Sequence, residues 1–411
     1  MVTVLEADVR CQFPAFVSRP GTIFFDNAAT TQKPAKVVET MVRFYESECA
    51  NAGRGVSGLS TRARAGIERV RGAVAELLGA DAADVAFTGG ATDSLNLVAL
   101  SWGLHNLNDG DEIMLCLDDH RSATLPWLNL VQTLKQFGKH VKVVPFAIHE
   151  VGDYDLKSIR SGVSERTRVL AMTHVHHVYG LEMEVQEVRD IVGDAVVISL
   201  DASQSIGHTA VKVSELPVDF ISFSGHKMFG PTGVGALWAR RNRHREMKPV
   251  RIGGGTQCVI SEGDGAALEV SFSGTFAEIC EAGTYDTPAI LGLGEAVSFI
   301  QSIGVEHIEA HVSSLTKYLY DQVVGMPGIE FAPGPGICGC PGGYGILAFR
   351  FQQAESADVA FLLDSENIMV RSGNLCKGRN DEADDFLRIS LHVYNSRDEI
   401  DRLIEVLQSE L

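Results

Sequence analysis

A lysine stands directly after a short apolar run in the stretch FSGHKMFGPTGVG, which covers residues 223–235. Ser224 and His226 come just before this lysine, and a turn rich in glycine and proline follows it. Burial at the end of a strand, beside other cationic groups, lowers the pKa of a lysine. A lysine of this kind is a nucleophile toward a carbonyl carbon. Lys227 is therefore the first candidate catalytic residue, and an aldehyde is its expected partner.

An aspartate occupies a similar place after another apolar run. The stretch VVISLDASQ, residues 196–204, puts Asp201 just past a predicted strand and Gln204 three residues later. A carboxylate at the end of a buried strand needs a partner, because burying an unpaired charge is costly. Strand-end aspartates serve metal ions, ribose hydroxyls and pyridinium nitrogens, so this residue alone leaves the ligand open.

Two further features offer contacts for an anion and for a flat ring. The stretch FTGGATDSLN, residues 87–96, follows a predicted strand and opens a predicted helix. Its glycines let backbone N–H groups approach an anion, and Thr92 adds a hydroxyl. His120, in LDDHRSATLPW, follows the predicted strand at 112–116, where an imidazole can stack on a ring. Either feature alone is more often structural than functional.

The order of these features along the chain indicates one cofactor. A phosphate loop, a ring-stacking histidine, a carboxylate and a lysine follow one another, as expected for pyridoxal 5′-phosphate (PLP). Asp201 would keep the pyridine nitrogen protonated, and Lys227 would form the Schiff base. The sequence therefore predicts a PLP enzyme that draws electrons from the α-carbon of an amino acid.

The chain resembles the class V aminotransferase superfamily of fold-type I PLP enzymes, and within it the Suf-type (group II) cysteine desulfurases. The resemblance runs nearly from end to end, and so many ordered matches are highly specific for the superfamily but less specific for the reaction. The motifs that carry it are FFDNAATTQKP (24–34), RGVSGLS (54–60), GGATDSLNLVA (89–99), DDHRSATLPW (118–127), THVHHVYG (173–180), LDASQ (200–204), SFSGHKMFGPTGVGALW (222–238), EAGTYDTPA (281–289), VRSGNLC (370–376) and LRISLHVYN (387–395).

This resemblance implies a role for a set of residues. Arg388 would hold the substrate carboxylate, a task that suits the forked guanidinium group. Thr284 would reach the phosphate of a neighbouring subunit, which implies a homodimer with shared active sites, and a sulfur-acceptor protein is a further implied partner. The implied catalytic residues are Lys227, His120, Asp201 and the sulfur-accepting Cys376. The implied cofactor contacts are Ala91, Thr92, His120, His177, Asp201, Gln204, Ser224, His226, Lys227 and Thr284, and the implied substrate contacts are Asn27, Ala28 and Arg388.

Departures from the family pattern lie around the substrate. The family's HRGVHTLS reads GRGVSGLS here, its RTGHHC reads RSGNLC, and its EHHSN has lost the second histidine. A histidine also replaces the asparagine that is usual beside the ring oxygen. The replacing residues are Gly53, Ser57, Arg121, His177, Asn374 and Leu375.

Two reactions therefore stay open. A cysteine desulfurase would convert L-cysteine to alanine and leave the sulfur on Cys376. A specialised biosynthetic relative would act on a cysteine with a bulky group on sulfur, by β-elimination or by a decarboxylating or oxidative route, as desulfurase-like enzymes of lincosamide antibiotic pathways do. The retained Cys376 favours the first reaction, and the changed pocket favours the second. A plain aminotransferase is a further alternative.

The elements that must position these residues alternate along the chain. Helical patterns such as 61–79 and 92–103 separate apolar runs that are typical of strands covered on both faces. This alternation predicts an α/β domain at 21–290 with a mainly parallel, seven-stranded sheet. A smaller α+β domain is predicted at 291–411, with residues 1–20 folding back onto it. The predicted strands are 84–88, 112–116, 141–146, 168–174, 196–200, 219–223 and 235–239, followed by 344–351 and 385–391 in the smaller domain.

Composition narrows the range of partners and places. The 411 residues carry 53 acidic and 35 basic side chains, a net charge of −18, which argues against binding nucleic acid or an anionic membrane. The first residues lack a basic-then-apolar signal pattern, so a cytoplasmic protein is expected. The eight cysteines are scattered, and Cys338 and Cys340 in CGCPGG have no second pair, so a glycine-rich loop is expected there and no metal site.

Overall fold

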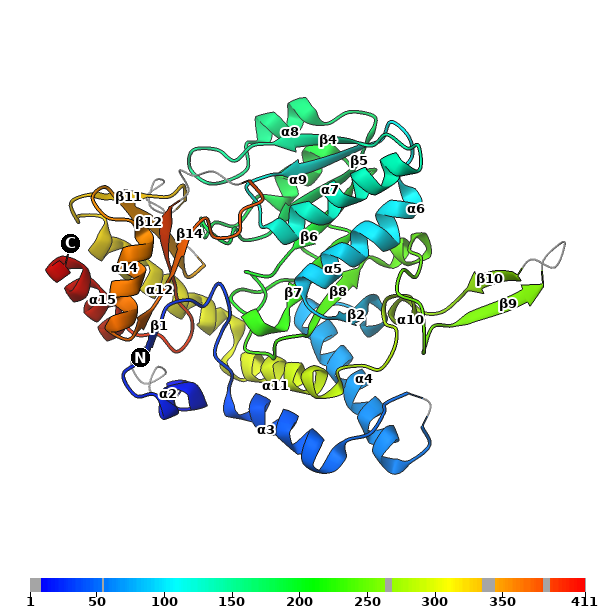
Figure 1. The fold of residues 1–411 in the computed structure, drawn as a ribbon, viewed down its shortest axis with the longest axis horizontal. Coiled ribbons are helices and arrows are strands. Elements are labelled where there is room, and N and C mark those ends of the chain that lie inside the picture. Colours follow the sequence, from blue (N-terminus) through cyan, green and yellow to red (C-terminus); the bar gives the residue numbers. More distant parts are fainter. Residues whose placement is uncertain (1–8, 54, 263–267, 335–343, 380–384, 411) are drawn as a thin grey trace.

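The computed structural model describes residues 9–53, 55–262, 268–334, 344–379 and 385–410 (Figure 1). Cys338 and Cys340 lie outside the described residues. In the described part, no single helix has both the length and the apolar character to cross a bilayer, although two consecutive helices, Thr287–Ile303 and Val305–Val323, bent by 76° at their junction, pass on combined length and composition.

A seven-stranded sheet forms the centre of the molecule, as the sequence predicts. Its strand order is β2-β8-β7-β6-β5-β3-β4. The pairs from β7 to β4 are parallel, and β8 is antiparallel to both of its neighbours. The strands are β2 (Val85–Thr88), β3 (Glu112–Cys116), β4 (Lys142–Phe146), β5 (Thr167–Thr173), β6 (Val197–Asp201), β7 (Phe220–Ser224) and β8 (Gly235–Ala239).

Helices cover both faces of this sheet, because alternate strand residues point to opposite sides. Ile113 and Leu115 pack in one apolar cluster with α5 and α7, while Met114 and Cys116 pack in another with α4, α9 and α11. The helices of this part are α3 (Ala35–Arg43), α4 (Gly58–Leu78), α5 (Ala91–Leu97), which continues through a π-helical turn into α6 (Leu104–Asn106), α7 (Arg121–Gln136), α8 (Leu156–Gly162), α9 (Val185–Val192), α10 (Phe276–Cys280) and α11 (Thr287–Ile303).

The helix predicted at 61–79 begins earlier than expected, for a local reason. The side chain of Ser57 accepts a hydrogen bond from the backbone N–H of Ser60 (3.2 Å) and caps α4, which starts at Gly58. At the other end, Gly79 has a left-handed φ of 64° and stops the helix.

A second, four-stranded sheet follows with the order β11-β12-β15-β14. A capping box stands at the start of the last helix, since Ser396 and Glu399 exchange backbone-to-side-chain hydrogen bonds of 3.2 and 3.3 Å. The elements of this part are β11 (Ile329–Phe331), β12 (Ile346–Phe351), β13 (Ile368–Met369), β14 (Arg371–Gly373), β15 (Phe386–Ser390), α12 (Val305–Val323), α14 (Ser356–Ser365) and α15 (Arg397–Glu410).

The start of the described chain contacts both parts of the molecule. Around α2 (Pro14–Ser18), Phe13 packs edge-to-face on Tyr394 and on Phe299, and β1 (Ile23–Phe24) pairs with β13 in parallel. The domain boundary predicted at residue 290 falls inside α11, which runs without interruption from Thr287 to Ile303. The division into two domains therefore stays a prediction.

A β-hairpin projects away from the body of the molecule (Figure 1). It consists of β9 (Cys258–Glu262) and β10 (Leu268–Phe272), paired antiparallel, and every residue of both strands is exposed. No strand is predicted there from the sequence pattern. Neither strand contributes to an apolar cluster among the described residues, so the usual alternation of buried and exposed residues is missing.

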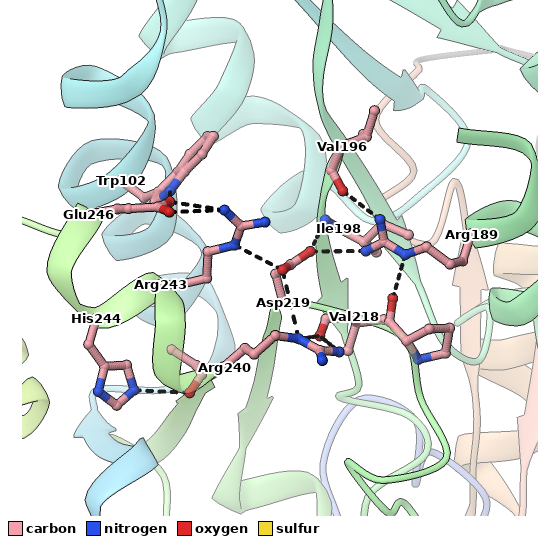
Figure 2. A network of polar contacts seen from close by, with 12 residues as sticks. Trp102, Arg189, Val196, Ile198, Val218, Asp219, Arg240, Arg243, His244 and Glu246 are labelled. Carbon is pink, nitrogen blue, oxygen red and sulfur yellow. Dashed lines mark hydrogen bonds and ion pairs between the residues drawn. The ribbon is translucent and has the colours of Figure 1, made fainter. Parts of the chain in front are cut away.

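A buried carboxylate fixes the amino-terminal end of β7 (Figure 2). Asp219 accepts hydrogen bonds from Arg189 (3.0 Å), from Arg243 (2.9 Å) and from the backbone N–H of Ile198 in β6 (2.9 Å). The guanidinium of Arg240 lies 3.8 Å away. The buried charge is thus paired and hydrogen-bonded, which is what makes burial of an ion tolerable.

Candidate active site

A cavity of about 280 Å³ lies at the carboxyl ends of the parallel strands. This edge of an open α/β sheet is where such folds bind ligands. His120 follows β3, His177 follows β5, Asp201 ends β6, and Lys227 follows β7. Of the predicted site residues, the cavity is lined by Ala28, Ala91, Thr92, His120, His177, Asp201, Gln204, Ser224, His226, Lys227, Cys376 and Arg388.

Lys227 ends a short 3₁₀ turn, Gly225–Lys227, that directly continues β7. The carbonyl of His226 in this turn accepts hydrogen bonds from the backbone N–H of Thr31 (2.9 Å) and from the amine of Lys33 (3.0 Å). Burial lowers the pKa of Lys227, and Arg388 lowers it further, while Asp201 opposes the shift. A lowered pKa increases the neutral, nucleophilic fraction of the amine.

Hydroxyl and amide groups gather at the start of α5. Gly90 has a φ of 136°, which a residue with a side chain rarely adopts, and it turns the backbone so that the N–H of Ala91 donates to Ser224 Oγ (2.8 Å). Thr92 Oγ1 and Ser122 Oγ are 2.7 Å apart. Together with the ring of His226, these groups form a set of donors suited to a phosphate.

Asp201 is held with one of its oxygens in a fixed direction. Its Oδ1 accepts hydrogen bonds from the backbone N–H (3.0 Å) and the hydroxyl (2.5 Å) of Ser203. Gln204 Nε2 donates to the carbonyl of Ala28 (2.8 Å), and the N–H of Ala28 donates to Ser390 Oγ (2.9 Å). The two predicted residues of the LDASQ motif thus lie on the same wall of the cavity.

Two imidazoles meet over the cavity. The rings of His120 and His177 are edge-to-face with centroids 5.0 Å apart. His120 Nδ1 accepts from the N–H of Ser122 (3.1 Å), whereas both ring nitrogens of the buried His177 lack a hydrogen-bond partner in the described part of the chain. Burial lowers the pKa of His120 to about 4, with the charge of Lys227 adding to the shift, and burial lowers that of His177 well below its usual value. Both rings are neutral near pH 7.

A carboxylate between two arginines marks the mouth of the cavity. Asp26 pairs with Arg388 (3.3 Å) and with Arg371 (2.7 Å). Arg388 is buried and also donates to the carbonyl of His177 (2.9 Å), but its Nε has no partner among the described residues. The trio has one positive charge in excess, so it suits a substrate carboxylate.

Cys376 lies at the same mouth with an exposed side chain. Its φ of 65° and that of Leu375, 57°, are both left-handed, which is uncommon outside glycine. Such backbone strain persists only where the surroundings hold it, and it is frequent at functional sites.

Two predicted residues do not line this cavity. Asn27 is fully buried, and its amide nitrogen donates to the carbonyls of Phe24 (3.2 Å) and Ser390 (2.6 Å), so this side chain has protein partners instead of a free face. Thr284 is exposed on another surface, where it accepts from Asn51 Nδ2 (3.5 Å).

The cavity also contains residues that were not predicted as contacts from the sequence. Ser122, Ser203 and Arg371 line it, and Asp26 orients its two arginines. Each lies inside a motif that carries the family resemblance, close to a predicted site residue. Position inside DDHRSATLPW, next to His120, is the signal that would have found Ser122.

The residues present fit PLP. The residues around this one cavity include two buried imidazole nitrogens and one guanidinium nitrogen without partners among the described residues, a fixed carboxylate, and an amine with a lowered pKa. A buried polar group without a partner costs free energy, so such groups point to a polar ligand. No group of three or more His, Cys, Asp or Glu side chains in the described ranges is arranged to hold a metal ion.

Comparison with known proteins gives the class. The model of the aminotransferase class-V family matches residues 23–403. The chain therefore belongs to the aminotransferase class-V family, and it is a PLP-dependent enzyme.

Individual relatives agree with this class. A cysteine desulfurase of Pectobacterium carotovorum is 33% identical over 97% of this chain and 96% of its own length. A probable cysteine desulfurase of Halalkalibacterium halodurans is 32% identical over 94% of this chain and 92% of its own length. The apo structure of a cysteine desulfurase from Thermococcus onnurineus matches with a TM-score of 0.86 at 32% identity, covering 98% of this chain and 97% of that one. The chain is thus a cysteine desulfurase-like enzyme of the class-V family.

Proposed function

We propose that this enzyme removes the sulfur atom of L-cysteine and transfers it to its own Cys376. The observation that carries the proposal is the presence of Lys227, Arg388 and Cys376 around one cavity. In the overall reaction, the sulfur of L-cysteine forms a bond to Cys376 Sγ as its bond to carbon breaks, giving a persulfide. The carbon skeleton leaves as alanine. The two thiol hydrogens, one from Cys376 and one from L-cysteine, are both kept: one ends on the β-carbon of alanine and the other on the persulfide.

PLP, when bound, supplies an aldehyde that captures the substrate amine and a ring that accepts electrons from the α-carbon. Ala91, Thr92, Ser224 and His226 would hold its phosphate, and Asp201 would hold its ring nitrogen. His120 and His177, both neutral, would pack against the ring without adding positive charge to the cavity.

The residues of the chain divide the remaining work. Arg388, oriented by Asp26, binds and aligns the substrate carboxylate. The amine of Lys227, with its lowered pKa, takes up and returns the α-proton as a general base. Cys376, at the cavity mouth, meets the substrate sulfur on the side that faces solvent.

A second candidate reaction is favoured by His177. This residue replaces the family's asparagine, and both of its ring nitrogens lack partners in the described structure. They could bind a polar group that L-cysteine does not have, such as a substituent on sulfur. Elimination of a substituted thiol, giving pyruvate and ammonia, would then be the reaction, and Cys376 would not accept sulfur.

We also propose a homodimer and a protein acceptor for the sulfur. The hairpin of β9 and β10 exposes Val259 (63%), Ile260 (64%) and Leu268 (72%), which is a large apolar area for a surface of this chain alone. Thr284 lies on the surface and not in the cavity of its own chain, which fits a contact with the site of a second copy. Light scattering on the purified protein tests the dimer, and a monomer at micromolar concentration would contradict it.

A cytoplasmic location remains a prediction from the sequence.

Product analysis decides between the two reactions. The PLP-loaded protein is incubated with L-cysteine and, separately, with an S-substituted cysteine, and the organic products are identified by mass spectrometry. Alanine from L-cysteine together with one extra sulfur atom on the Cys376 peptide supports desulfuration. Pyruvate from the substituted substrate, with little alanine from L-cysteine, supports elimination.

A further inference from the structure

The segment that carries Cys376 runs antiparallel along the segment that carries His120. The backbone N–H of Arg121 donates to the carbonyl of Cys376 (3.0 Å). The N–H of Gly378 donates to Asp119 (2.8 Å), and the N–H of Arg379 donates to Leu117 (2.7 Å). His120 and Lys377 face each other in an isolated bridge. The cysteine is thus tied to the large sheet through residues that follow β3.

Two side chains strengthen this connection. Arg121 Nε donates to the carbonyl of Lys377 (3.1 Å). The amine of Lys377 pairs with Asp118 (3.2 Å) and lies 5.6 Å from the centre of the Tyr179 ring. Lys377 is 5% exposed. A buried lysine with an ion pair and an aromatic contact is costly to move, because its charge would lose both partners.

The backbone of the segment requires this close packing. A Cβ atom on Gly378 would lie 2.8 Å from the carbonyl oxygen of Leu117, so only glycine allows the approach. Leu375, 8% exposed, packs in a small apolar cluster with Val178, Tyr179 and Phe386, and it precedes Cys376 with the left-handed backbone described above. The strained backbone at 375–376 is thus held from both sides.

We infer that Arg121 and Lys377 are positioning residues that hold the thiol of Cys376 at the cavity mouth. The inference rests on the proposed function for its meaning, since a fixed thiol matters only if it receives sulfur. Neither residue lines the cavity.

The test measures the reactivity of one thiol. The holoenzyme, without substrate, is treated with iodoacetamide, and alkylation of each cysteine is followed by peptide mass spectrometry. Cys49, exposed on another segment, is the internal reference. In Arg121→Ala and Lys377→Ala we expect the Cys376 rate, divided by the Cys49 rate, to rise about three- to tenfold, because local opening of the segment also exposes the side of the thiol that lines the cavity. Lys317→Ala, which breaks an exposed pair with Asp321, is the matched control and leaves the ratio unchanged.

Milder variants guard against a general loss of folding. Asp118→Asn removes the charge that lies 3.2 Å from the amine of Lys377, and we expect it to raise the ratio in the same direction, whereas Lys377→Arg keeps the charge of the lysine and the wild-type ratio. With L-cysteine, kcat falls in Arg121→Ala and Lys377→Ala while the affinity for the amino acid, read from the cofactor spectrum, stays at the wild-type value.

The inference is overturned if the alkylation ratio stays within about twofold of wild type in Arg121→Ala, Lys377→Ala and Asp118→Asn. Because alkylation is measured without substrate, this outcome is separate from a failure of the proposed reaction. If the enzyme forms no alanine from L-cysteine, the reaction is wrong, and the alkylation ratio still reports whether the two residues hold the thiol.

Discussion

A buried charged residue lies at each end of β7, but the surroundings of the two residues differ. At the amino-terminal end, Asp219 is surrounded by guanidinium groups and a backbone N–H, and these partners satisfy its oxygens (Figure 2). Just past the carboxyl end, the amine of Lys227 faces a cavity, and burial lowers the pKa of this amine. Near it, His177 and Arg388 have polar atoms without partners in the described structure.

This difference indicates that one end of β7 serves stability and the other end serves function. A buried ion that is fully paired keeps its charge and fixes neighbouring strands. Buried polar groups that the protein leaves unpaired, and whose pKa values are shifted, are typical of a site that a ligand completes. The Asp219 network should therefore matter for unfolding, and the Lys227 cavity for chemistry.

Removal of the lysine should have the largest effect on chemistry. In Lys227→Ala we expect turnover to fall by about 10³-fold or more, since both the nucleophile and the general base are lost. The visible absorption of the attached cofactor should disappear, while the thermal midpoint changes little. An unchanged yellow absorption band would contradict the assignment of Lys227.

Removal of the paired carboxylate should have the reverse pattern. In Asp219→Ala we expect the free energy of unfolding to fall by about 3–5 kcal/mol, because Arg189 and Arg243 are left buried or half-buried without their partner. Urea unfolding measures the change. Activity per folded molecule should stay near wild type, and a large loss of turnover with full stability would break the comparison.

Replacement of the ring-facing carboxylate should weaken catalysis more than folding. In Asp201→Ala we expect a loss of about 10²-fold or more in kcat/KM, since the group that stabilises charge on the cofactor ring is gone. Steady-state kinetics and urea unfolding on the same preparation compare the two effects. Full turnover in this variant would contradict the role of Asp201.

Replacement of the thiol distinguishes the two reactions proposed for the cavity. In Cys376→Ser we expect sulfur transfer from L-cysteine to fall by about 10²-fold or more, because the nucleophile is lost. An elimination enzyme would lose only a small part of its activity toward an S-substituted cysteine. Alanine and pyruvate measured side by side give the size of each loss.

Replacement of the buried His208 should give the smallest effect, which depends on pH. Burial lowers the pKa of His208 in the folded protein to about 4, whereas the same side chain in the unfolded chain has a pKa of about 6.5. Between these values the unfolded state holds more protons, so stability is full above about pH 6.5 and falls as the pH drops toward 4. We expect His208→Phe to reduce this fall by on the order of 1–3 kcal/mol. An identical pH dependence of unfolding in the variant would rule this out.

Local patterns in the sequence predict the central sheet and the residues at its carboxyl edge. The seven central strands are apolar runs, so their positions and their mainly parallel arrangement follow from alternation with helices. Lys227, Asp201 and His120 stand at strand ends, which places them at one edge of the sheet. The strand-end residues of the cavity can therefore be predicted from the sequence alone.

The rest depends on contacts between distant segments. Asp26 and Arg371 are separated by 345 positions, and no local pattern pairs them. The strands β9 and β10 are exposed at every residue, so they lack the alternation of buried and exposed positions that predicts a strand. The left-handed Cys376 accepts a hydrogen bond from the backbone N–H of Arg121, a residue 255 positions away that only the folded chain brings beside it.

The most direct measurement locates the cofactor on the chain. The PLP-loaded protein is reduced with borohydride, digested, and mapped by mass spectrometry. The account predicts a pyridoxyl group on the peptide that contains Lys227. A modification on another lysine would contradict it, and Lys33, whose pKa is lowered to about 8 by burial, is the main competitor.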